Sequence, residues 1–470
     1  MSWKLSLEEL VRATGGRPLS QVIKSWSGVG TDTRVDLTGQ LFVALRGERF
    51  DAHSFVKQAV EKGATGLLVD KSLSDLKELT DKVTLVQVKD TLKGLQDLAH
   101  FWRHRHQAKV IAITGSTGKT TTKELTATLL GQKFKLHSSK GSYNNHWGVP
   151  LTLLGINSTH EMAVVEMGMN RPGELTRLCE IAEPDVTLVT NVGRAHIGEL
   201  GSQQAVADAK WEIYRSCPDS IQVYNLINKH TIAMHAEAVK QGVEKIITFS
   251  NSDKSDFDVS LKVIALGLDY LQVIGLVGGV EGEARVPIFG RQNRINIMAA
   301  AALALAVGME PERIWSAMPE LRCACWGRNQ LVPLKNGARV LFDGYNANPE
   351  SMAALIQNFF EIETRGRKIY VLGEMLELGT ETGRLHQELG EMVGRTDADI
   401  VWFIGPSKAD FEQGMKLSQF QKTVYLSDSY EQGLASRIGS VLNDQDIVAL
   451  KGSRGMKLEQ VLQGWDPVGF

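Results

Sequence analysis

The segment from residue 110 to 123, VIAITGSTGKTTTK, restricts the fold of this chain more than any other stretch. Its apolar start predicts the end of a buried parallel strand, and Leu125, Leu129 and Leu130 fall on one face of a helix that follows. A glycine turn between a strand and a helix directs backbone N–H groups and the positive end of the helix dipole toward an anion. The segment therefore predicts an α/β domain with a site for nucleotide phosphates.

The glycine turn departs from the common pattern G-x-x-x-x-G-K-[ST], which would need glycine where this chain has Ile113. In the shorter loop that is present, Lys119 supplies positive charge for phosphates and the Thr120 hydroxyl can reach a Mg²⁺ ion. The alternative is a tight strand-to-helix turn with a surface lysine. The nucleotide-binding candidates in the loop are Gly115, Ser116, Thr117, Gly118, Lys119, Thr120 and Thr121.

The length of 470 residues predicts several domains, because a single domain holds about 100–200 residues. We expect three domains, at residues 1–95, 96–318 and 319–470. A formal net charge of −2 argues against nucleic acid as the main partner. The longest apolar run, residues 298–309, is too short to span a bilayer, and four cysteines without a C-x-x-C pair indicate reduced thiols. We therefore expect a soluble cytoplasmic protein without membrane insertion.

Apolar runs alternate with helical patterns through the chain, which is typical of the α/β class. The first domain is expected to be a small α/β domain and the central one a parallel sheet that carries the phosphate loop. Several short strands are expected between residues 219 and 290, before an alanine-rich helix at 297–307. The last domain has predicted strands at 339–343, 368–372, 400–405 and 446–451. Each enters a glycine turn, which predicts a doubly wound, Rossmann-like sheet.

Three further side chains stand at or after predicted strands of the central domain. Glu166 ends an apolar run, and a carboxylate at the end of a parallel strand is a candidate Mg²⁺ ligand, with a rim glutamate as the alternative. His196 follows the next strand, but Mg²⁺ prefers oxygen, so a hydrogen-bonding loop residue is the simpler interpretation. Lys210 lies on a predicted helix over 202–215, where a lone lysine usually faces solvent.

Two other polar groups have less specific patterns. The run from Thr31 to Arg34, with Arg46 and His53 further on, is compatible with a diphosphate or uracil site, although ordinary surface polarity is the simpler interpretation. Asn293 and Asn296 lie three residues apart at a predicted helix start. They can contact an adenine edge or a ribose, or they can serve only as helix caps.

Taken together, blocks along nearly the whole chain resemble the Mur ligases, the ATP-dependent amide-forming enzymes of peptidoglycan assembly. The phosphate loop resembles that of the family, and Tyr345-Asn-Ala-Asn-Pro349 is similar to the form in the member that adds D-alanyl-D-alanine. Most relatives have Tyr-Ala-His-x-Pro there. The chain departs from the family at Gln292, Ala52 and Thr31, where His, Gly and Ser are common. The other matching blocks are YNNHWGVP at 143–150, VVEMG at 164–168, NVGRAH at 191–196 and GRQNRIN at 290–296.

The resemblance implies ATP and two Mg²⁺ ions as cofactors, and UDP-N-acetylmuramoyl-tripeptide and D-alanyl-D-alanine as substrates of a monomeric enzyme. Thr120 and Glu166 would hold one ion, and His196 with a carbamylated Lys210 would hold the other. The substrate carboxylate would take the γ-phosphate, and the dipeptide amine would then attack the acyl phosphate to give a tetrahedral intermediate. The implied catalytic residues are Lys119, His196 and Lys210.

The resemblance also implies contacts outside the loop. The implied nucleotide contacts are Asn145, Asn293, Asn296, Arg328, Asp343, Tyr345 and Asn346. The implied UDP-substrate contacts are Thr31, Asp32, Thr33, Arg34, Arg46, Asp51 and His53. The alternatives are a ligase of the same superfamily that adds a single amino acid, a folylpolyglutamate-type synthetase, and an ATPase that performs no ligation.

Overall fold

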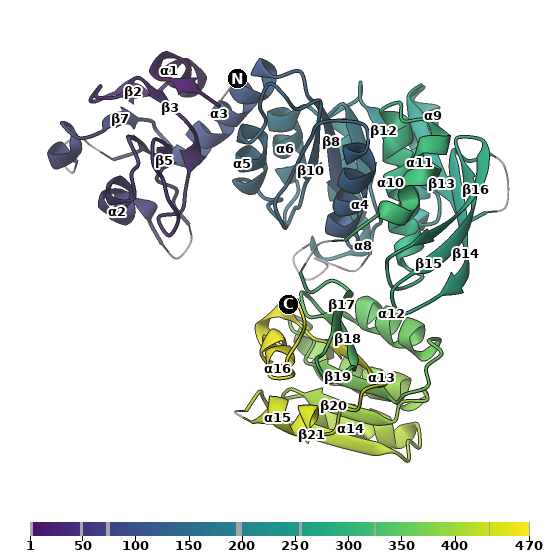
Figure 1. Ribbon diagram of the computed structural model, residues 1–470. Helices are drawn as coiled ribbons and strands as arrows, with labels where there is room; N and C mark the ends of the chain where they lie inside the picture. Colours follow the sequence, from purple (N-terminus) through teal and green to yellow (C-terminus); the bar gives the residue numbers. More distant parts are fainter. Residues whose placement is uncertain are drawn as a thin grey trace. The chain divides into compact units, whose positions relative to one another are not determined.

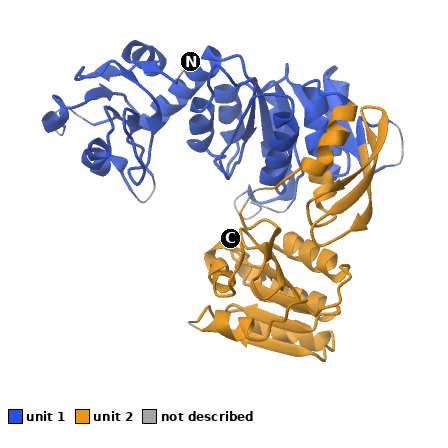
Figure 2. Ribbon diagram, viewed as in Figure 1, with its two compact units in different colours: residues 1–259, 299–310 blue, residues 260–298, 311–470 orange. Residues whose placement is uncertain are grey.

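The computed structural model describes residues 3–47, 50–71, 76–193, 200–252, 256–323, 326–431 and 433–469. By their internal contacts these residues form two compact units (Figure 2). Unit 1 holds residues 1–259 and 299–310, and unit 2 holds residues 260–298 and 311–470.

Unit 1 begins with a five-stranded sheet in the order β2-β7-β6-β5-β4 (Figure 1). Strands β4 to β7 are parallel, and β2 is antiparallel to β7. Ser6 and Glu9 form a capping box at the start of α1, in which each side chain accepts from the backbone N–H of the other residue. The elements of this part are β1 (Leu5–Ser6), α1 (Leu7–Thr14), β2 (Arg17–Pro18), β3 (Ser25–Trp26), β4 (Val29–Gly30), β5 (Leu41–Val43), η1 (Ala52–Phe55), α2 (Val56–Glu61), β6 (Gly66–Val69), η3 (Lys77–Leu79) and β7 (Thr84–Gln87).

The larger part of unit 1 is a parallel sheet in the order β13-β12-β11-β8-β10-β9. Its strands are β8 (Lys109–Thr114), β9 (Leu136–Ser138), β10 (Met162–Glu166), β11 (Val186–Val189), β12 (Ile221–Asn225) and β13 (Ile246–Ser250). Its helices are α3 (Thr91–Arg105), α4 (Lys119–Gly131), α5 (Gly148–Leu154), α6 (Glu174–Ala182), α8 (Gln203–Arg215) and α9 (Lys229–Lys240). The next strands along the chain, β9 and β10, lie on one side of β8, and β11 to β13 lie on its other side. The loop after β8 is therefore at a topological switch point, where open α/β sheets bind ligands.

Residues 219–290 form the expected strands, and helix α9 lies among them. The Asn228 side chain caps the helix by accepting hydrogen bonds from the N–H groups of His230 and Thr231. Thr231, Met234 and Ala238 are buried along one face, a helical spacing that is less conspicuous in the sequence than the apolar runs on either side.

Unit 2 combines a β-hairpin region with a second α/β sheet. Strands β15 and β16 pair antiparallel from Leu271↔Val286 to Val277↔Val280. The predicted alanine-rich helix is confirmed as α10, which begins at Asn293 and continues into the residues assigned to unit 1. The elements here are β14 (Val259–Leu266), β15 (Leu271–Val277), β16 (Val280–Val286), α10 (Asn293–Ala306), α11 (Pro311–Ala317) and η4 (Met318–Glu320).

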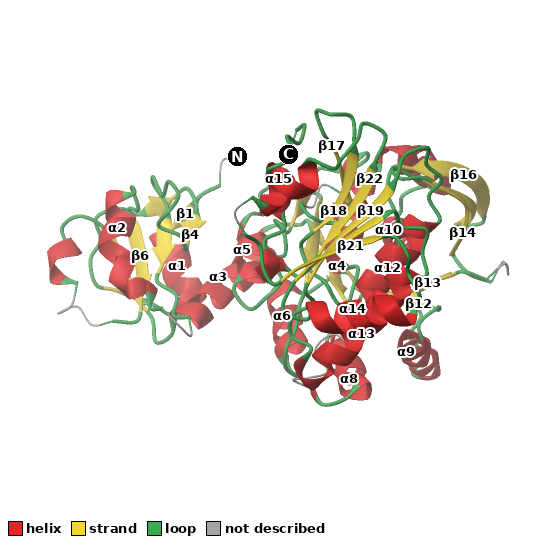
Figure 3. Ribbon diagram, turned by 90° about the horizontal axis from the view of Figure 1, so that it is seen from below, coloured by secondary structure: helices red, strands yellow, loops and turns green. Residues whose placement is uncertain are grey.

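The six-stranded sheet of unit 2 has the order β17-β18-β22-β19-β20-β21 and is parallel except for β17 (Figure 3). The strands are β17 (Gln330–Pro333), β18 (Arg339–Asp343), β19 (Lys368–Gly373), β20 (Ile400–Ile404), β21 (Thr423–Ser427) and β22 (Ile447–Lys451). The helices are α12 (Pro349–Phe360), η5 (Gly379–Glu381), α13 (Thr382–Gly394), α14 (Lys408–Leu417), α15 (Leu434–Gly439), η6 (Arg454–Met456) and α16 (Glu459–Gln463).

Helices cover both faces of this sheet, as the prediction of a doubly wound domain requires. Alternate strand residues such as Leu341 and Tyr370 pack in one buried cluster with α12, α13 and α14. Their neighbours Val340 and Ile369 pack in another with α15 and α16. The α/β class is confirmed. None of the helices in the described ranges combines the length and the apolar character needed to cross a bilayer.

Candidate functional site

The phosphate loop follows β8 in a conformation that depends on glycine. Gly115 has a φ of 150°, and a Cβ atom there would lie 1.9 Å from Thr190 Oγ1. Gly118 is left-handed with a φ of 78° and stands as the N-cap of α4 without a side chain to satisfy the first N–H groups of the helix. These N–H groups and the helix dipole form the anion-binding end that the sequence predicted.

The loop is tied to the segment after β11. Thr117 N–H donates to Asn191 Oδ1 over 3.0 Å, and Asn191 Nδ2 donates to Thr117 Oγ1 over 2.7 Å. The Thr190 hydroxyl donates to the Thr117 carbonyl, and Ser116 Oγ accepts from Gly193 N–H. Thr190 and Asn191 were not among the predicted site residues, because their partners lie more than 70 positions earlier in the chain.

Two lysines near the loop have different surroundings. Lys119 Nζ donates to the Gly115 carbonyl over 2.7 Å, so its charge lies over the loop. Lys123, one turn further along α4, is fully buried and donates to the carbonyls of Ser139 and Gly141 over 2.7 and 2.9 Å. Lys123 thereby holds α4 to the segment that leads to Asn144 and Asn145, a role that its place after three threonines did not indicate.

Glu166 lies at the end of β10, which pairs with β8 through Glu166↔Ile113. It is 1% exposed, and its Oε1 accepts from Asn144 Nδ2 over 2.7 Å. No described residue donates to Oε2, which is buried. Since a buried carboxylate oxygen is costly to leave without a partner, this oxygen and the buried Thr120 hydroxyl fit a hard cation that prefers oxygen ligands.

Asn144 and Asn145 make different contacts, and only Asn145 was among the predicted site residues. Asn144, which the sequence analysis did not select, makes the contact with Glu166. Asn145 Oδ1 accepts from Gly148 N–H over 2.9 Å and so supports the start of α5. Its proposed contact with a nucleotide stays a prediction.

Lys210 on α8 is 1% exposed, which contradicts the interpretation of a solvent-facing lysine. Burial and the nearby Lys119 charge hold the pKa of Lys210 well below its usual value, because both disfavour the charged ammonium form of Lys210. The fold therefore places Lys210 within the field of the Lys119 charge, while the catalytic roles of both lysines stay predictions. His196 lies outside the described residues.

The loop from Thr31 to Arg34, which follows β4, is partly exposed, with Arg34 the most accessible of its residues. Arg34 donates to both carboxylate oxygens of Asp32, and these hydrogen bonds lower the pKa of Asp32 to about 2. Thr33 Oγ1 donates to Gln58 Oε1. Thr31 lies in the same loop after β4, and the four residues remain accessible to a ligand.

Arg46, Asp51 and His53 form a closed network with Asp70. Arg46 donates to both oxygens of Asp70, and His53 Nε2 accepts from Asp70 N–H over 3.1 Å. His53 Nδ1 lies 2.6 Å from Asp51 Oδ1, which also accepts from His53 N–H. Burial would raise the pKa of Asp51, but the hydrogen bonds from His53 outweigh it and lower the pKa to about 2. These groups hold η1 in place, and a contact with UDP stays a prediction.

The asparagines at the start of α10 are buried in unit 2. Asn293 Nδ2 donates to the Phe289 carbonyl, and Asn296 Nδ2 donates to Asn293 Oδ1, each over 2.7 Å. Gln292, where the family often has His, accepts from Asn358 Nδ2 over 2.9 Å. These bonds organise the turn before α10 and leave adenine recognition untested.

The remaining predicted nucleotide contacts converge in unit 2 at the ends of β18 and β22. Lys451 Nζ donates to Asp343 Oδ2 over 2.5 Å and to the Asn346 carbonyl over 2.8 Å. The Arg328 guanidinium lies over the Tyr345 ring, 4.2 Å from its centre. The buried Lys451 was not among the candidates, although its place at a strand end was the available signal.

Comparison with known proteins decides the family. A model of the Mur ligase middle domain matches residues 113–304, and a model of the Mur ligase glutamate ligase domain matches residues 327–454. The UDP-N-acetylmuramoyl-tripeptide--D-alanyl-D-alanine ligase of Bacillus subtilis (strain 168) is 34% identical over 460 residues, which cover 97% of either chain. The chain belongs to the Mur ligase family. The resemblance inferred from the sequence is confirmed.

Solved Mur ligase structures agree in fold. A crystal structure of MurF from Acinetobacter baumannii has a TM-score of 0.86 and 30% identity and covers 98% of either chain. MurF ligase from Thermotoga maritima, crystallised in complex with ADP, has a TM-score of 0.76 and 25% identity, covering 93% of this chain and 96% of that one. The three-domain Mur ligase fold is thus confirmed, while the domain boundaries near residues 95 and 318 stay predictions.

Proposed function

We propose that this Mur ligase uses ATP to join D-alanyl-D-alanine to the carboxylate of UDP-N-acetylmuramoyl-tripeptide during peptidoglycan precursor synthesis. The observation that carries the proposal is a glycine phosphate loop beside the buried Glu166, whose Oε2 has no partner among the described residues. The relative from Bacillus subtilis named for this reaction matches along almost the whole chain. We place the reaction in the cytoplasm because it consumes ATP.

The residues of unit 1 suit phosphoryl transfer. The loop N–H groups and Lys119 would bind the phosphates, while Thr120 and Glu166 would hold a Mg²⁺ ion. When bound, the ion supplies charge neutralisation, which lets a carboxylate approach the γ-phosphate. Asn144 orients Glu166 through Oε1 and leaves Oε2 available. Positioning and charge stabilisation are the main catalytic contributions in reactions of this class.

Lys210 would act as an anion after carbamylation, which forms a bond from Nζ to the carbon of CO₂ and releases a proton. The burial of Lys210 supports this proposal, because an isolated ammonium group is costly in that environment and a neutral amine is the form that reacts. The carbamate, with His196, would hold a second Mg²⁺ ion. Mass spectrometry of the intact enzyme under ¹³CO₂, after trapping of the carbamate, should place the label on Lys210. An active, metal-bound enzyme with unmodified Lys210 would overturn it.

The other predicted contacts have separate roles in the proposal. Asn293, Asn296, Arg328, Asp343, Tyr345 and Asn346 in unit 2 would contact the nucleotide, as would Asn145 in unit 1. The groups around Thr31 to Arg34 would bind the UDP part of the acceptor. Support comes from the exposed loop after β4 and from the convergence of the unit 2 residues at two adjacent strand ends.

A substrate panel tests the function directly. ADP release should require ATP, Mg²⁺, UDP-N-acetylmuramoyl-tripeptide and D-alanyl-D-alanine together, and mass spectrometry should detect the pentapeptide product. Tripeptides ending in lysine and in diaminopimelate should both be offered, with L-alanyl-L-alanine and D-alanine as amine controls.

The same panel separates the alternatives. ADP release with a single amino acid and a shorter acceptor would indicate another amino-acid-adding Mur ligase, and release with glutamate and a folate would indicate a folylpolyglutamate-type synthetase. ATP hydrolysis at a rate that no acceptor or amine changes, with no ligated product, would contradict a ligase function.

A further inference from the structure

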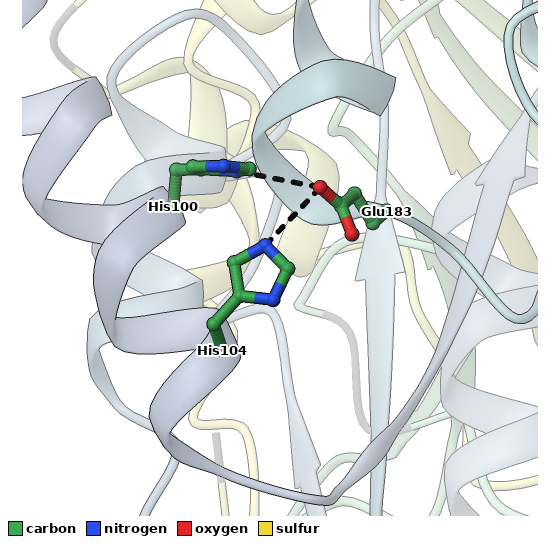
Figure 4. A group of neighbouring side chains, drawn as sticks. All are labelled: His100, His104 and Glu183. Atoms are coloured by element: carbon green, nitrogen blue, oxygen red, sulfur yellow. Dashed lines mark hydrogen bonds and ion pairs between the residues drawn. The ribbon is translucent and has the colours of Figure 1, made fainter.

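Helix α3 carries two histidines on one face, away from the phosphate loop. His100 and His104 are four residues apart, a spacing that places side chains on successive turns of a helix. Their ring centres lie 4.7 Å apart, and both rings point toward Glu183 (Figure 4). The three side chains are 42%, 55% and 51% exposed, although the His100 Nδ1 atom itself is buried.

Glu183 is held in this place by the end of α6. It is the C-cap of that helix with a left-handed φ of 42°, which is uncommon for a residue other than glycine or asparagine. Its N–H donates to the Cys179 carbonyl over 2.7 Å. The backbone that carries the carboxylate is therefore fixed relative to α6, and α6 packs against α3.

The ligand atoms are spaced for one small cation. Glu183 Oε1 lies 3.1 Å from His104 Nε2 and 3.8 Å from His100 Nδ1, and all three groups offer atoms within 4.8 Å of one another. In tetrahedral Zn²⁺ sites, bonds of about 2.1 Å put neighbouring ligand atoms about 3.4 Å apart. The two measured distances to Glu183 bracket that value, and His100 Nδ1 has no hydrogen-bond partner among the described residues.

We propose that His100, His104 and Glu183 form a binding site for a divalent transition metal ion of the Zn²⁺ class. Two imidazoles and one carboxylate are a common ligand set for such ions, and water would complete the coordination. Mg²⁺ is a poor occupant because it prefers oxygen ligands. The site is distinct from the proposed Mg²⁺ site at Glu166, which contains oxygen ligands from β10 and α4.

The surrounding charges favour a cation at this position. His104 lies in the last turn of α3 and Glu183 follows α6 directly, so the negative ends of two helix dipoles meet there. The Arg103 guanidinium is the nearby opposing charge, and it is neutralised by Asp185 at 3.0 Å while it donates to the carbonyls of Ala182 and Glu183. A bound ion would join α3 to α6 and stabilise that part of unit 1.

Titration of the metal-stripped full-length protein with ZnCl₂, in millimolar Mg²⁺ to fill oxygen sites, tests the proposal. We expect one saturable equivalent by calorimetry, a rise in melting temperature, and visible absorption of tetrahedral type with Co²⁺. His104→Ala and Glu183→Gln should each weaken Zn²⁺ binding by about tenfold or more. His230→Ala, a histidine on α9, should leave the affinity unchanged.

Absence of saturable binding, or binding that is unchanged in the double variant His100→Ala with His104→Ala, would overturn the proposal. Circular dichroism of each variant without metal checks that the fold is intact, and the difference in melting temperature with and without Zn²⁺ remains measurable even if a variant is less stable. Ligase activity is not needed for any of these measurements.

Discussion

Polar side chains end adjacent parallel strands in both units, but the two groups differ in how fully they satisfy one another. In unit 1, Glu166 ends β10 beside β8, and its Oε2 has no partner among the described residues. In unit 2, Asp343 and Lys451 stand opposite each other on β18 and β22 and form a close ion pair. Glu166 therefore has an oxygen that can bind a ligand, whereas the charges of Asp343 and Lys451 mainly bind each other.

This difference predicts where substitutions affect activity and where they affect stability. A group that is left open for a ligand stabilises the protein little, so its removal should mainly reduce turnover. A buried ion pair that loses one member leaves an uncompensated charge, so its disruption should mainly reduce the free energy of unfolding.

The largest effect is expected for Lys119→Ala. Loss of a charge that stabilises the transferring phosphoryl group should lower ligation about 10³-fold, roughly 4 kcal/mol of transition-state stabilisation. ADP release and product formation measure it, with circular dichroism as the check on folding. Lys109→Ala, at the exposed start of β8, the strand that leads into the loop, is the control and should keep its turnover. Retained ligation in Lys119→Ala would refute the role of the loop.

The second-largest effect is expected for Glu166→Gln, because the amide replaces an anionic metal ligand. Turnover should fall about 10²-fold, and a higher Mg²⁺ concentration should be needed for the half-maximal rate. Steady-state ADP release over a Mg²⁺ series measures both effects. Glu161→Gln is the matched control, since Glu161 precedes the same strand and is exposed. An unchanged Mg²⁺ dependence would remove Glu166 from the metal site.

Lys451→Met should act on stability first. Asp343 would remain without its ammonium partner, and the free energy of unfolding should fall by about 3 kcal/mol in urea denaturation. Lys408→Met removes the partner of Asp428 in an exposed pair between the start of α14 and the residue after β21, and should cost about 1 kcal/mol or less. Equal losses of stability in the two variants would contradict the conclusion that the buried Asp343–Lys451 pair stabilises unit 2 more than an exposed pair does.

The smallest effect concerns the closed network of the first sheet. Asp51→Ala removes the cap of η1 and should cost about 1 kcal/mol at neutral pH. Because the folded pKa of Asp51 is about 2, below the unfolded value of about 3.9, its contribution is complete above pH 4 and is lost as the pH falls toward 2. Urea denaturation between pH 2 and 7 should show the two proteins converging in acid. Asp81→Ala, an exposed residue before β7, is the control.

Local patterns predicted much of the fold and the loop. The glycine turn before Lys119 and the alanine-rich helix each depend on residues a few positions apart, and both are confirmed. The burial of Lys210, the clamp made by Lys123 and the partner of Glu166 were not predicted. Each depends on side chains brought together from distant segments, as when Asn144 contacts Glu166 across 22 positions.

The α/β class, the phosphate loop and the resemblance to the Mur ligases follow from the amino-acid sequence, because strand and helix periods, glycine turns and motif order are local patterns in the chain. Which polar groups are buried, which are paired and which face another element depends on how distant segments pack in the fold. The free-energy cost of a buried charge depends on the side chains packed around it, and these come from segments far apart in the sequence. For that reason Lys119 and Lys451 look equally basic in the sequence, whereas in the fold one lies over the phosphate loop and the other completes a buried ion pair.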